Sequence, residues 1–251
     1  MGGGSSHFGT LDMKADMKQV MGQQTMSISE SICTNSDVMS VLSRSFSGTA
    51  TTAPEGTLDW VVGPSLKEKW DDPRRRTLFD WLMKMEWALA FAHNGFGISG
   101  LKPDGTVGAV ILVVPHEGIQ SDLSSTTEAV RALWGVGRPP LKAMESVSAF
   151  RRRAFAAQSA VEEVKNKYCK GPHAHVKVVA VDPDAQGMGF CGKLMRYVNA
   201  WADSRQLPLW LETSGERNVA IYERFGYKTM ERYDFRCGRE VHENEFGMLR
   251  A

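Results

Sequence analysis

A glycine-rich loop between Val181 and Gly192 joins a valine-rich strand to a helix. The first N–H groups of a helix have no partner within the helix, and the helix dipole adds about half a positive charge at that end. Gly187 and Gly189 let the backbone approach an anion with no Cβ atom in the way. Because a pyrophosphate is the natural occupant of such a loop, these residues predict a site for a phosphate-bearing cofactor.

Two classes of cofactor site fit these glycines. Gly187, Gly189 and Gly192 satisfy the G-x-G-x-x-G fingerprint of dinucleotide-binding folds, and Glu212 follows about 20 residues further on. In those folds the glycines follow their strand almost at once, whereas residues 182–186 intervene here. The chain after the loop is also short for a full nucleotide-binding sheet. A dinucleotide site is therefore the less favoured alternative.

The order of residues in the loop, Val-x-Pro-x-x-Gln-Gly-x-Gly, resembles the acetyl-CoA-binding motif of the GNAT acetyltransferase superfamily, Gln/Arg-x-x-Gly-x-Gly/Ala. Gln186 and Gly189 match the motif, whereas Cys191 replaces its final Gly or Ala and places a larger side chain beside the phosphates. The residues after the loop resemble a second signature of the superfamily: Leu211-Glu-Thr-Ser, followed by Asn218, Tyr222 and Phe225-Gly-Tyr227. This second signature looks like that of small-molecule members such as puromycin N-acetyltransferase.

The resemblance implies a layered α/β (α+β) fold, with a mixed, mostly antiparallel central sheet, one splayed parallel strand pair and helices on both faces. The parallel pair would be Val176 to Val181 and Leu207 to Glu212, with acetyl-CoA in the gap between them. Backbone groups would hold the pantetheine and the thioester carbonyl at Val179, Ala180 and Val181. The N–H groups that would take the pyrophosphate are those of Gln186, Gly187, Met188, Gly189, Phe190, Cys191 and Gly192. Asn218 would contact the cofactor or cap its own helix, and both assignments stay open.

Acetyl transfer to an amine needs a proton donor for the leaving thiolate, and the amine must lose a proton before it attacks. Tyr222 matches the superfamily position of the donor, and packing of its helix onto the sheet is its alternative role. Glu212, at a strand end, is one candidate general base, with a structural hydrogen bond or an ammonium clamp as the alternative. His175 is another candidate base, because it alternates with Lys177, Val179 and Val181 on one strand face and a histidine titrates near neutral pH; an ordinary strand-edge residue is the alternative. Arylalkylamine N-acetyltransferases have a similar His-x-His strand, whose second histidine would align with Lys177.

The resemblance therefore predicts an acyltransferase that moves the acetyl group of acetyl-CoA to a primary amine of a small molecule, by direct attack in a ternary complex. A protein or peptide acceptor is one alternative. A non-catalytic acyl-CoA-binding module is another, which Cys191 favours and which Tyr222 and Glu212 oppose. No metal is expected, and the acceptor and the oligomeric state stay open.

The elements that position these residues follow from periodicity and turn signals. Helices are expected at 36–46, 72–94, 187–204 and 218–225, and strands at 96–101, 107–114, 173–181, 207–213, 227–233 and 245–249, the last at a sheet edge. Residues 47–59 are expected to form a loop, and Asp104-Gly105 is expected to form the turn of a hairpin between the strands at 96–101 and 107–114. A flexible tail over residues 1–35 is expected to precede a single domain over 36–251, with a helical insertion at about 119–170.

Composition limits the partners. The formal net charge of +1 creates no global field toward nucleic acid or membranes. The four cysteines lack zinc spacing, which favours free thiols in a reducing compartment. No apolar run approaches the ~20 residues of a membrane span, so a cytoplasmic protein is expected. Gly2 with Ser6 formally fits the N-myristoylation pattern, which is often matched by chance.

Overall fold

The computed structural model describes residues 28–30, 36–48, 56–67, 69–116 and 134–251. The predicted tail, including Gly2, lies outside the described residues except for 28–30, which form a short strand. The first part of the predicted insertion, up to residue 133, lies outside them as well.

Three described helices precede strand β2 (Phe96–Leu101) in the chain: α2 (Ser36–Ser47), α3 (Gly56–Val62) and α4 (Pro73–Ala92). The start of α4 confirms the predicted helix. Asp72 is its N-cap and accepts a hydrogen bond from the backbone N–H of Arg74, and Pro73 occupies the first turn.

The prediction of a loop over residues 47–59 is wrong from Gly56 onward, where α3 begins. Tertiary contacts stabilise this short helix, because Asp59 accepts a buried hydrogen bond of 2.5 Å from Arg75 of α4. Val61 and Val62 are buried as well. Packing therefore outweighs the weak helix propensity of the local sequence.

In the described part of the chain, seven strands form one sheet in the order β1-β2-β3-β4-β5-β7-β6. Their bounds are β1 (Ile28–Glu30), β2 (Phe96–Leu101), β3 (Val107–His116), β4 (His173–Val181), β5 (Leu209–Ser214), β6 (Lys228–Cys237) and β7 (Glu240–Arg250). Every neighbouring pair is antiparallel except β4 and β5. The predicted mixed, mostly antiparallel sheet is confirmed.

The last strand is not an edge strand, so the prediction for residues 245–249 is wrong on this point. β7 lies between β5 and β6, and β6 forms the edge. The run from Glu245 to Met248 is buried. A strand that is covered on both faces has consecutive buried residues. The buried run in β7 therefore agrees with its central position in the sheet.

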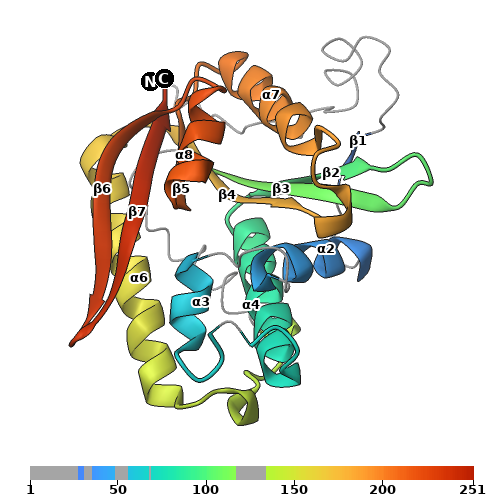
Figure 1. The fold of residues 1–251 in the computed structure, drawn as a ribbon. Coiled ribbons are helices and arrows are strands. Elements are labelled where there is room, and N and C mark those ends of the chain that lie inside the picture. Colours follow the sequence, from blue (N-terminus) through green and yellow to red (C-terminus); the bar gives the residue numbers. More distant parts are fainter. Residues whose placement is uncertain (1–27, 31–35, 49–55, 68, 117–133) are drawn as a thin grey trace, which may run out of the picture.

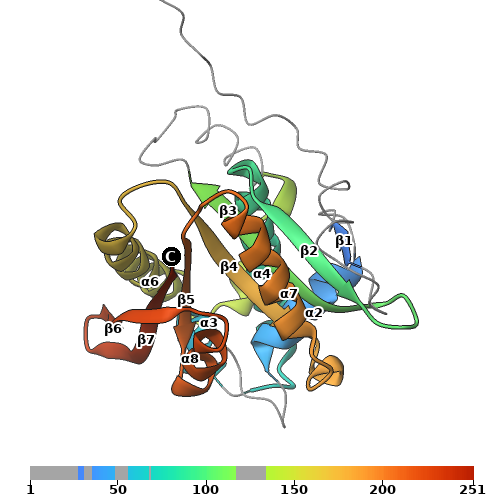
Figure 2. The same cartoon turned by 90° about the horizontal axis from the view of Figure 1, so that it is seen from above.

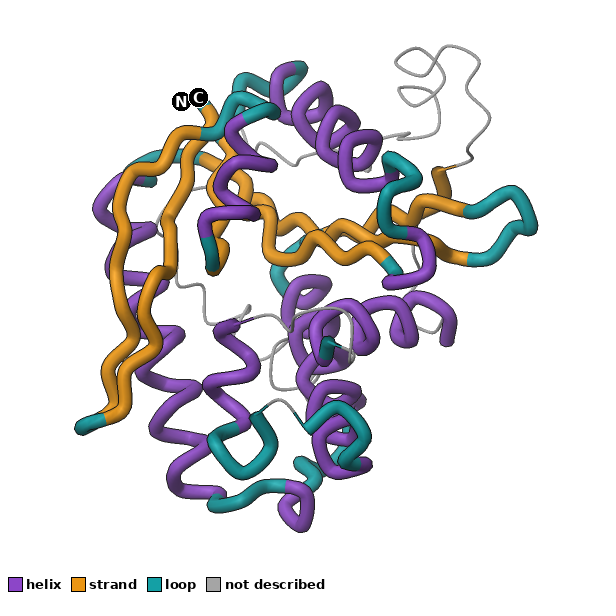
Figure 3. The backbone as a smooth tube through the Cα atoms, in the orientation of Figure 1, coloured by secondary structure: helices purple, strands orange, loops and turns teal. Residues whose placement is uncertain are grey.

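Helices cover both faces of the sheet (Figure 1). One face packs against α7 (Phe190–Asp203) and α8 (Glu216–Glu223), and we call it the α7 face. The other packs against α2, α3, α4 and α6 (Val147–Tyr168), and we call it the α4 face. Seen from above, α7 crosses the sheet on the side opposite to α4 (Figure 2), and the tube view separates the same layers (Figure 3).

Strand β3 shows how the two faces arise from sequence. Its residues alternate between the two cores, with Val110 and Leu112 on the α4 face and Ile111 and Val113 on the α7 face. Because successive side chains of a strand point to opposite sides, an unbroken run of apolar residues is buried on both faces. β3 is therefore a central strand, as its sequence requires.

The parallel strands β4 and β5 separate soon after they meet. They pair at two positions, Ala174 with Leu209 and His175 with Trp210. A β-bulge in β4 follows at once, because Val178 and Val176 lie opposite successive residues of β3 and leave Lys177 without a partner. The strands then diverge toward their carboxyl ends, which confirms the predicted splayed pair.

This arrangement excludes the dinucleotide alternative. Dinucleotide-binding folds place the glycine loop after a strand of a parallel, doubly wound sheet. Here the strand before the loop is β4, which is antiparallel to β3 along nearly its whole length.

Candidate active site

The glycine-rich loop begins where β4 ends. A 3-10 turn, η2 (Pro183–Ala185), leads to Gln186, and α7 begins at Phe190. The predicted helix starts three residues too early, because Gly187 and Gly189 have left-handed backbones with φ of 80° and 81°. Among the described residues, chain neighbours aside, no atom lies within 4 Å of an ideal Cβ on either glycine. The loop is therefore open to a ligand, with the unpaired N–H groups of the α7 N-terminus beside it.

A notch in the hairpin positions the start of α7. Gly100 of β2 and Gly108 of β3 carry no side chain where the Phe190 ring lies. A Cβ on Gly100 would come within 2.7 Å of that ring, and one on Gly108 within 2.8 Å. Phe190 itself is buried. The ring therefore fixes the first turn of α7 against β2 and β3.

The other loop residues divide between the core and solvent. Cys191 is partly buried against the core of the α7 face, and this burial raises the pKa of its thiol. Gln186 and Met188 are exposed. Gly192 faces Phe225 and Arg196. The side chain of Cys191 thus contributes to packing, and its thiol is not activated as a nucleophile.

The strand residues expected to hold the thioester lie beside the gap. Val179 and Val181 pack partly buried on the α7 face, whereas Ala180 is buried on the α4 face. On the other side of the gap, Asn218 donates a hydrogen bond of 3.1 Å from its side-chain amide to the carbonyl of Ser214. Asn218 therefore ties α8 to the end of β5, and contact with a cofactor remains a prediction.

Two of the predicted catalytic residues meet across the parallel pair. The Nε2 atom of His175 lies 2.6 Å from Oε2 of Glu212, and the Nε1–H group of Trp210 donates to Oε1 of the same carboxylate. His175 is 1% exposed and the Glu212 side chain 12%. Gly247 of β7 leaves the space in which the Trp210 ring lies. This three-residue bridge joins β4 to β5 just before they separate.

Electrostatics fix the protonation of the bridge. Burial alone would raise the pKa of Glu212, but His175, Lys177 and Trp210 outweigh it and lower the pKa. Burial lowers the pKa of His175 in spite of the neighbouring carboxylate. At neutral pH the pair is therefore an ionised Glu212 and a neutral His175. Because a carboxylate only accepts, Nε2 of His175 carries the hydrogen.

The bulge residue Lys177 joins the same cluster, and sequence reasoning missed it. Burial would lower its pKa, but the carboxylates of Glu86, Glu212 and Glu162 prevail and raise it. These carboxylates come from α4, β5 and α6.

The prediction that Val179 and Val181 share a strand face with His175 is wrong, because the bulge at Lys177 turns both valines to the α7 face. Neither the bulge nor the partners on distant helices can be read from the His-x-Lys spacing.

Tyr222 lies on the opposite side of the gap from β4, on α8. It is partly buried against the core of the α7 face, and its ring centroid lies 6.0 Å from that of Tyr227. The hydroxyl of Tyr227 is buried and has no hydrogen-bond partner among the described residues. The structure thus places Tyr222 and the Glu212–His175 pair on different faces of the sheet.

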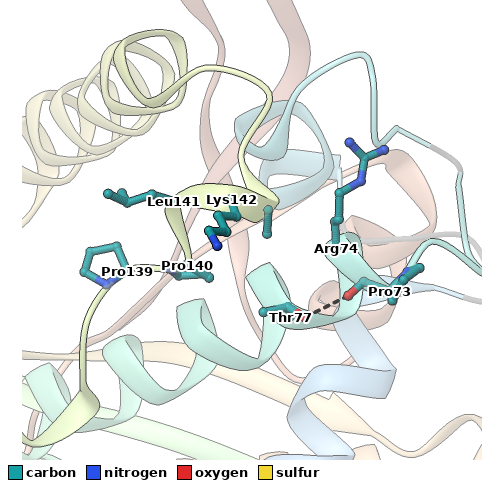
Figure 4. A pocket seen from close by; sticks show the side chains of 8 residues that line it. Pro73, Arg74, Thr77, Pro139, Pro140, Leu141 and Lys142 are labelled. Carbon is teal, nitrogen blue, oxygen red and sulfur yellow. Dashed lines mark hydrogen bonds between the residues drawn. The ribbon is translucent and has the colours of Figure 1, made fainter.

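A surface hollow of about 580 Å³ lies elsewhere, between the first turn of α4 and the segment around η1 (Leu141–Ala143). Pro73, Arg74 and Thr77 form one wall, and residues 139–143 form the other (Figure 4). None of the predicted site residues lines this hollow.

No described helix is both long and apolar enough to cross a membrane. No described group of three histidine, cysteine or acidic residues is arranged to hold a metal ion. Cys169, Cys191 and Cys237 are free thiols, and Cys33 lies outside the described residues.

Comparison with known proteins agrees with this fold and loop. Residues 152–229 match the model of the acetyltransferase (GNAT) domain, which is less than half of the chain. The match contains β4, the glycine-rich loop, α7, β5 and α8. The chain thus contains a GNAT acetyltransferase domain, which classes it as an acyltransferase. No curated protein sequence matches the chain.

Solved structures share the fold at low identity. Arylalkylamine N-acetyltransferase 2 from Aedes aegypti is 14% identical, with a TM-score of 0.54 over 91% of this chain and 99% of that chain. An agmatine N-acetyltransferase in its apo form is 13% identical, with a TM-score of 0.53 over 89% and 98%. A histone acetyltransferase and related acetyltransferase from Corynebacterium glutamicum is 16% identical, with a TM-score of 0.50 over 90% and 96%. The chain therefore has the GNAT fold.

Proposed function

We propose that this chain transfers the acetyl group of acetyl-CoA to the primary amine of a small molecule, by direct attack in a ternary complex. The observation that carries the proposal is the gap between β4 and β5, which opens toward the glycine-rich loop at the carboxyl end of β4. A long cofactor with a pyrophosphate at one end and a thioester at the other fits this geometry.

The cofactor would lie with its pyrophosphate on the N–H groups of residues 186–192 and its pantetheine along Val179 to Val181. Beyond the bulge, β4 has no partner strand on the side of β5. Backbone groups there are proposed to hold the pantetheine and the thioester carbonyl, except the carbonyl of Val181, which accepts a hydrogen bond from Ser45. Donors that are already oriented toward the carbonyl oxygen stabilise the negative charge that develops during attack.

Glu212 is proposed to attract the acceptor ammonium, with His175 and Trp210 holding its carboxylate in place. The lowered pKa of Glu212 keeps it ionised, which suits a clamp better than a general base. The ammonium therefore releases one proton to solvent before attack, and the proton that leaves the nitrogen after attack replaces the one that Tyr222 gives to the thiolate. His175 is buried, and its Nε2 atom is already bonded to Glu212. The clamp role of Glu212, which the sequence left as an alternative, is thus the one that we favour.

Tyr222 is proposed to protonate the departing thiolate of coenzyme A. It lies on α8, which follows β5 directly and flanks the gap from the α7 face. This is the face on which α7 and the glycine-rich loop lie. A proton donor on the cofactor side and a carboxylate on the other side would allow the amine to approach the thioester from the α4 face.

A small molecule is the favoured acceptor because two structures with the same fold, named above, are N-acetyltransferases of arylalkylamines and of agmatine. The carboxylates of Glu86, Glu162 and Glu212 surround the bulge. A cationic acceptor would be attracted to this side of the sheet.

The proposal is tested by following release of coenzyme A thiol with phenylethylamine, agmatine and an unblocked peptide as acceptors. We expect transfer to at least one of the two small amines and none to the peptide. Transfer to the peptide alone would replace the small-molecule acceptor with a protein acceptor. Tight binding of acetyl-CoA without transfer to any amine of a wider panel would indicate a non-catalytic module.

Two tyrosine variants extend the same assay. Tyr222→Phe should lower kcat by roughly a hundredfold or more, the usual contribution of a positioned proton donor, with little change in the KM for acetyl-CoA. Tyr227→Phe is the matched control, because its buried hydroxyl has no hydrogen-bond partner among the described residues, and it should leave kcat unchanged. Equal rates for the two variants would remove Tyr222 from the chemistry.

A further inference from the structure

The end of α2 contacts the point where β4 becomes the glycine-rich loop. Ser45 donates a hydrogen bond of 2.9 Å from Oγ to the carbonyl of Val181, the last residue of β4. The guanidinium of Arg44 donates to Asp182 at 3.1 Å and to Asp184 at 2.7 Å. Two adjacent side chains of one helix thus hold three positions, Val181, Asp182 and Asp184, around the strand end.

The residue after the strand is held from other directions as well. The backbone N–H of Asp182 donates to the carbonyl of Gly108 in β3 at 2.9 Å. Its Oδ1 atom accepts from the backbone N–H of Asp184 at 2.9 Å and caps η2. The Asp182 side chain is 6% exposed. Its contact with Arg44 is therefore the best shielded part of the arrangement.

Charge gives Arg44 a second effect. Asp182 and Asp184 place two carboxylates only a few residues before the loop expected to bind a pyrophosphate. Without a counter-charge they would repel that anion. Arg44 is the cation that bonds both, and Lys102 adds a weaker attraction for Asp184. Because two terminal nitrogens of Arg44 bond these carboxylates, its role is to hold and neutralise the turn.

We propose that Arg44 and Ser45 are positioning residues for the cofactor: they fix the turn over residues 182–185 and neutralise its carboxylates, so that the N–H groups of Gly187, Gly189 and Phe190 face the pyrophosphate. The N–H of Met188 donates instead to the carbonyl of Ala185. This inference rests on the proposed function for the identity of the ligand. It adds a role for α2, which lies outside the residues matched by the domain model. It also explains why a cofactor loop tolerates acidic residues.

Two ligands separate this role from general damage to the fold. Acetyl-CoA carries the pyrophosphate, whereas S-acetyl-pantetheine has the same thioester arm without it. Dissociation constants are measured by calorimetry for both ligands on the native chain and on Arg44→Ala. We expect Arg44→Ala to weaken acetyl-CoA binding by roughly tenfold and to leave S-acetyl-pantetheine binding unchanged.

Arg74→Ala is the matched control, because Arg74 also bonds the N-cap aspartate of a helix, Asp72 of α4, at a site remote from the loop. It should change neither dissociation constant. The double variant Arg44→Ala/Asp184→Asn should recover part of the lost affinity, since one repelling carboxylate is gone. Ser45→Ala removes only the bond to Val181, and it provides a milder variant if Arg44→Ala does not fold.

The outcomes are distinct. If the native chain does not bind acetyl-CoA, the proposed function fails and this inference fails with it. If the native chain binds acetyl-CoA and Arg44→Ala and Ser45→Ala bind it equally well, the inference alone is wrong. An equal loss for both ligands would show a general structural defect and would also overturn it.

Discussion

The bridge formed by His175, Glu212 and Trp210 shows what a single side-chain position can specify. The carboxylate accepts hydrogen bonds from two rings, one on each parallel strand. A buried charge is tolerated when it is paired and hydrogen-bonded, and Lys177 supplies a positive charge nearby. The bridge therefore holds the two strands together at the last position before they separate.

The pH dependence of transfer should follow the acceptor amine. Glu212 and His175 both have pKa values below their ordinary ones, so neither changes its charge between about pH 7 and 9. As the pH rises through the pKa of the acceptor, more neutral amine is present and kcat/KM increases. Profiles for two acceptors whose ammonium pKa values differ by about 2 units should be displaced by that difference.

If the rise of kcat/KM occurred at the same pH for both acceptors, it would reflect the pKa of a base in the protein. That result would contradict the prediction that the acceptor amine sets the pH dependence. Glu212→Gln gives a further check. Its neutral amide should raise the KM for the amine more than it lowers kcat, as expected for a residue that attracts the ammonium.

Sequence reasoning at this scale found His175 and Glu212 as separate candidates, and the structure brings them into contact. Their spacing of 37 residues predicts no contact by itself, because pairing of β4 with β5 brings them together. Lys177 and Trp210 were not assigned roles. A bulge shifts one residue out of register, and its position depends on the partner strand.

At the scale of elements, the site depends on where α7 begins. Two left-handed glycines delay the helix to Phe190, and the Phe190 ring fills the notch left by Gly100 and Gly108. The direction of the helix N-terminus, and hence of its unpaired N–H groups, follows from this contact. Packing in the hairpin is thereby linked to the proposed cofactor binding.

Gly100→Ala tests the contact, because its Cβ would lie 2.7 Å from the Phe190 ring. We expect a loss of about 1–3 kcal/mol in the free energy of unfolding, as is usual for overpacking, measured by denaturant titration. Phe190→Leu combined with Gly100→Ala should cost less than the sum of the single variants. Strict additivity would show that the notch does not position the helix.

Sequence reasoning located most elements well and their neighbours less well. The hairpin of β2 and β3 was predicted because Asp104-Gly105 is a strong turn signal between two apolar runs. The start of α3 and the central place of β7 were not, since both depend on tertiary contacts with distant residues such as Arg75 and with β5. Local patterns carry no record of such contacts.

At the scale of the whole molecule, the two faces of the sheet divide the proposed work. The α7 face carries the glycine-rich loop and Tyr222, and the α4 face carries Glu212, His175 and Lys177. The gap between β4 and β5 connects them. In the proposed function, the acyl donor lies along the gap and the acceptor lies on the α4 face. Sequence motifs predicted the residues around the acyl donor, whereas residues from separate helices form the acceptor side and no motif marks them.

The central claim is that the loop at Gly187 and Gly189 binds the pyrophosphate of acetyl-CoA. The most direct measurement is thermal unfolding with and without acetyl-CoA, on the native chain, on Gly189→Glu and on Gly105→Glu. Gly105 is the matched control, because it is also left-handed and, chain neighbours aside, has no described atom within 4 Å of an ideal Cβ, but it lies at the tip of the hairpin. Both variants therefore carry the same backbone strain and the same added charge.

Acetyl-CoA at about 100 times its dissociation constant should stabilise the native chain and Gly105→Glu by about 2.7 kcal/mol. Gly189→Glu should show little or no shift, because a carboxylate then occupies the position of the anion. An equal shift for Gly189→Glu, or no shift for the native chain, would contradict the account.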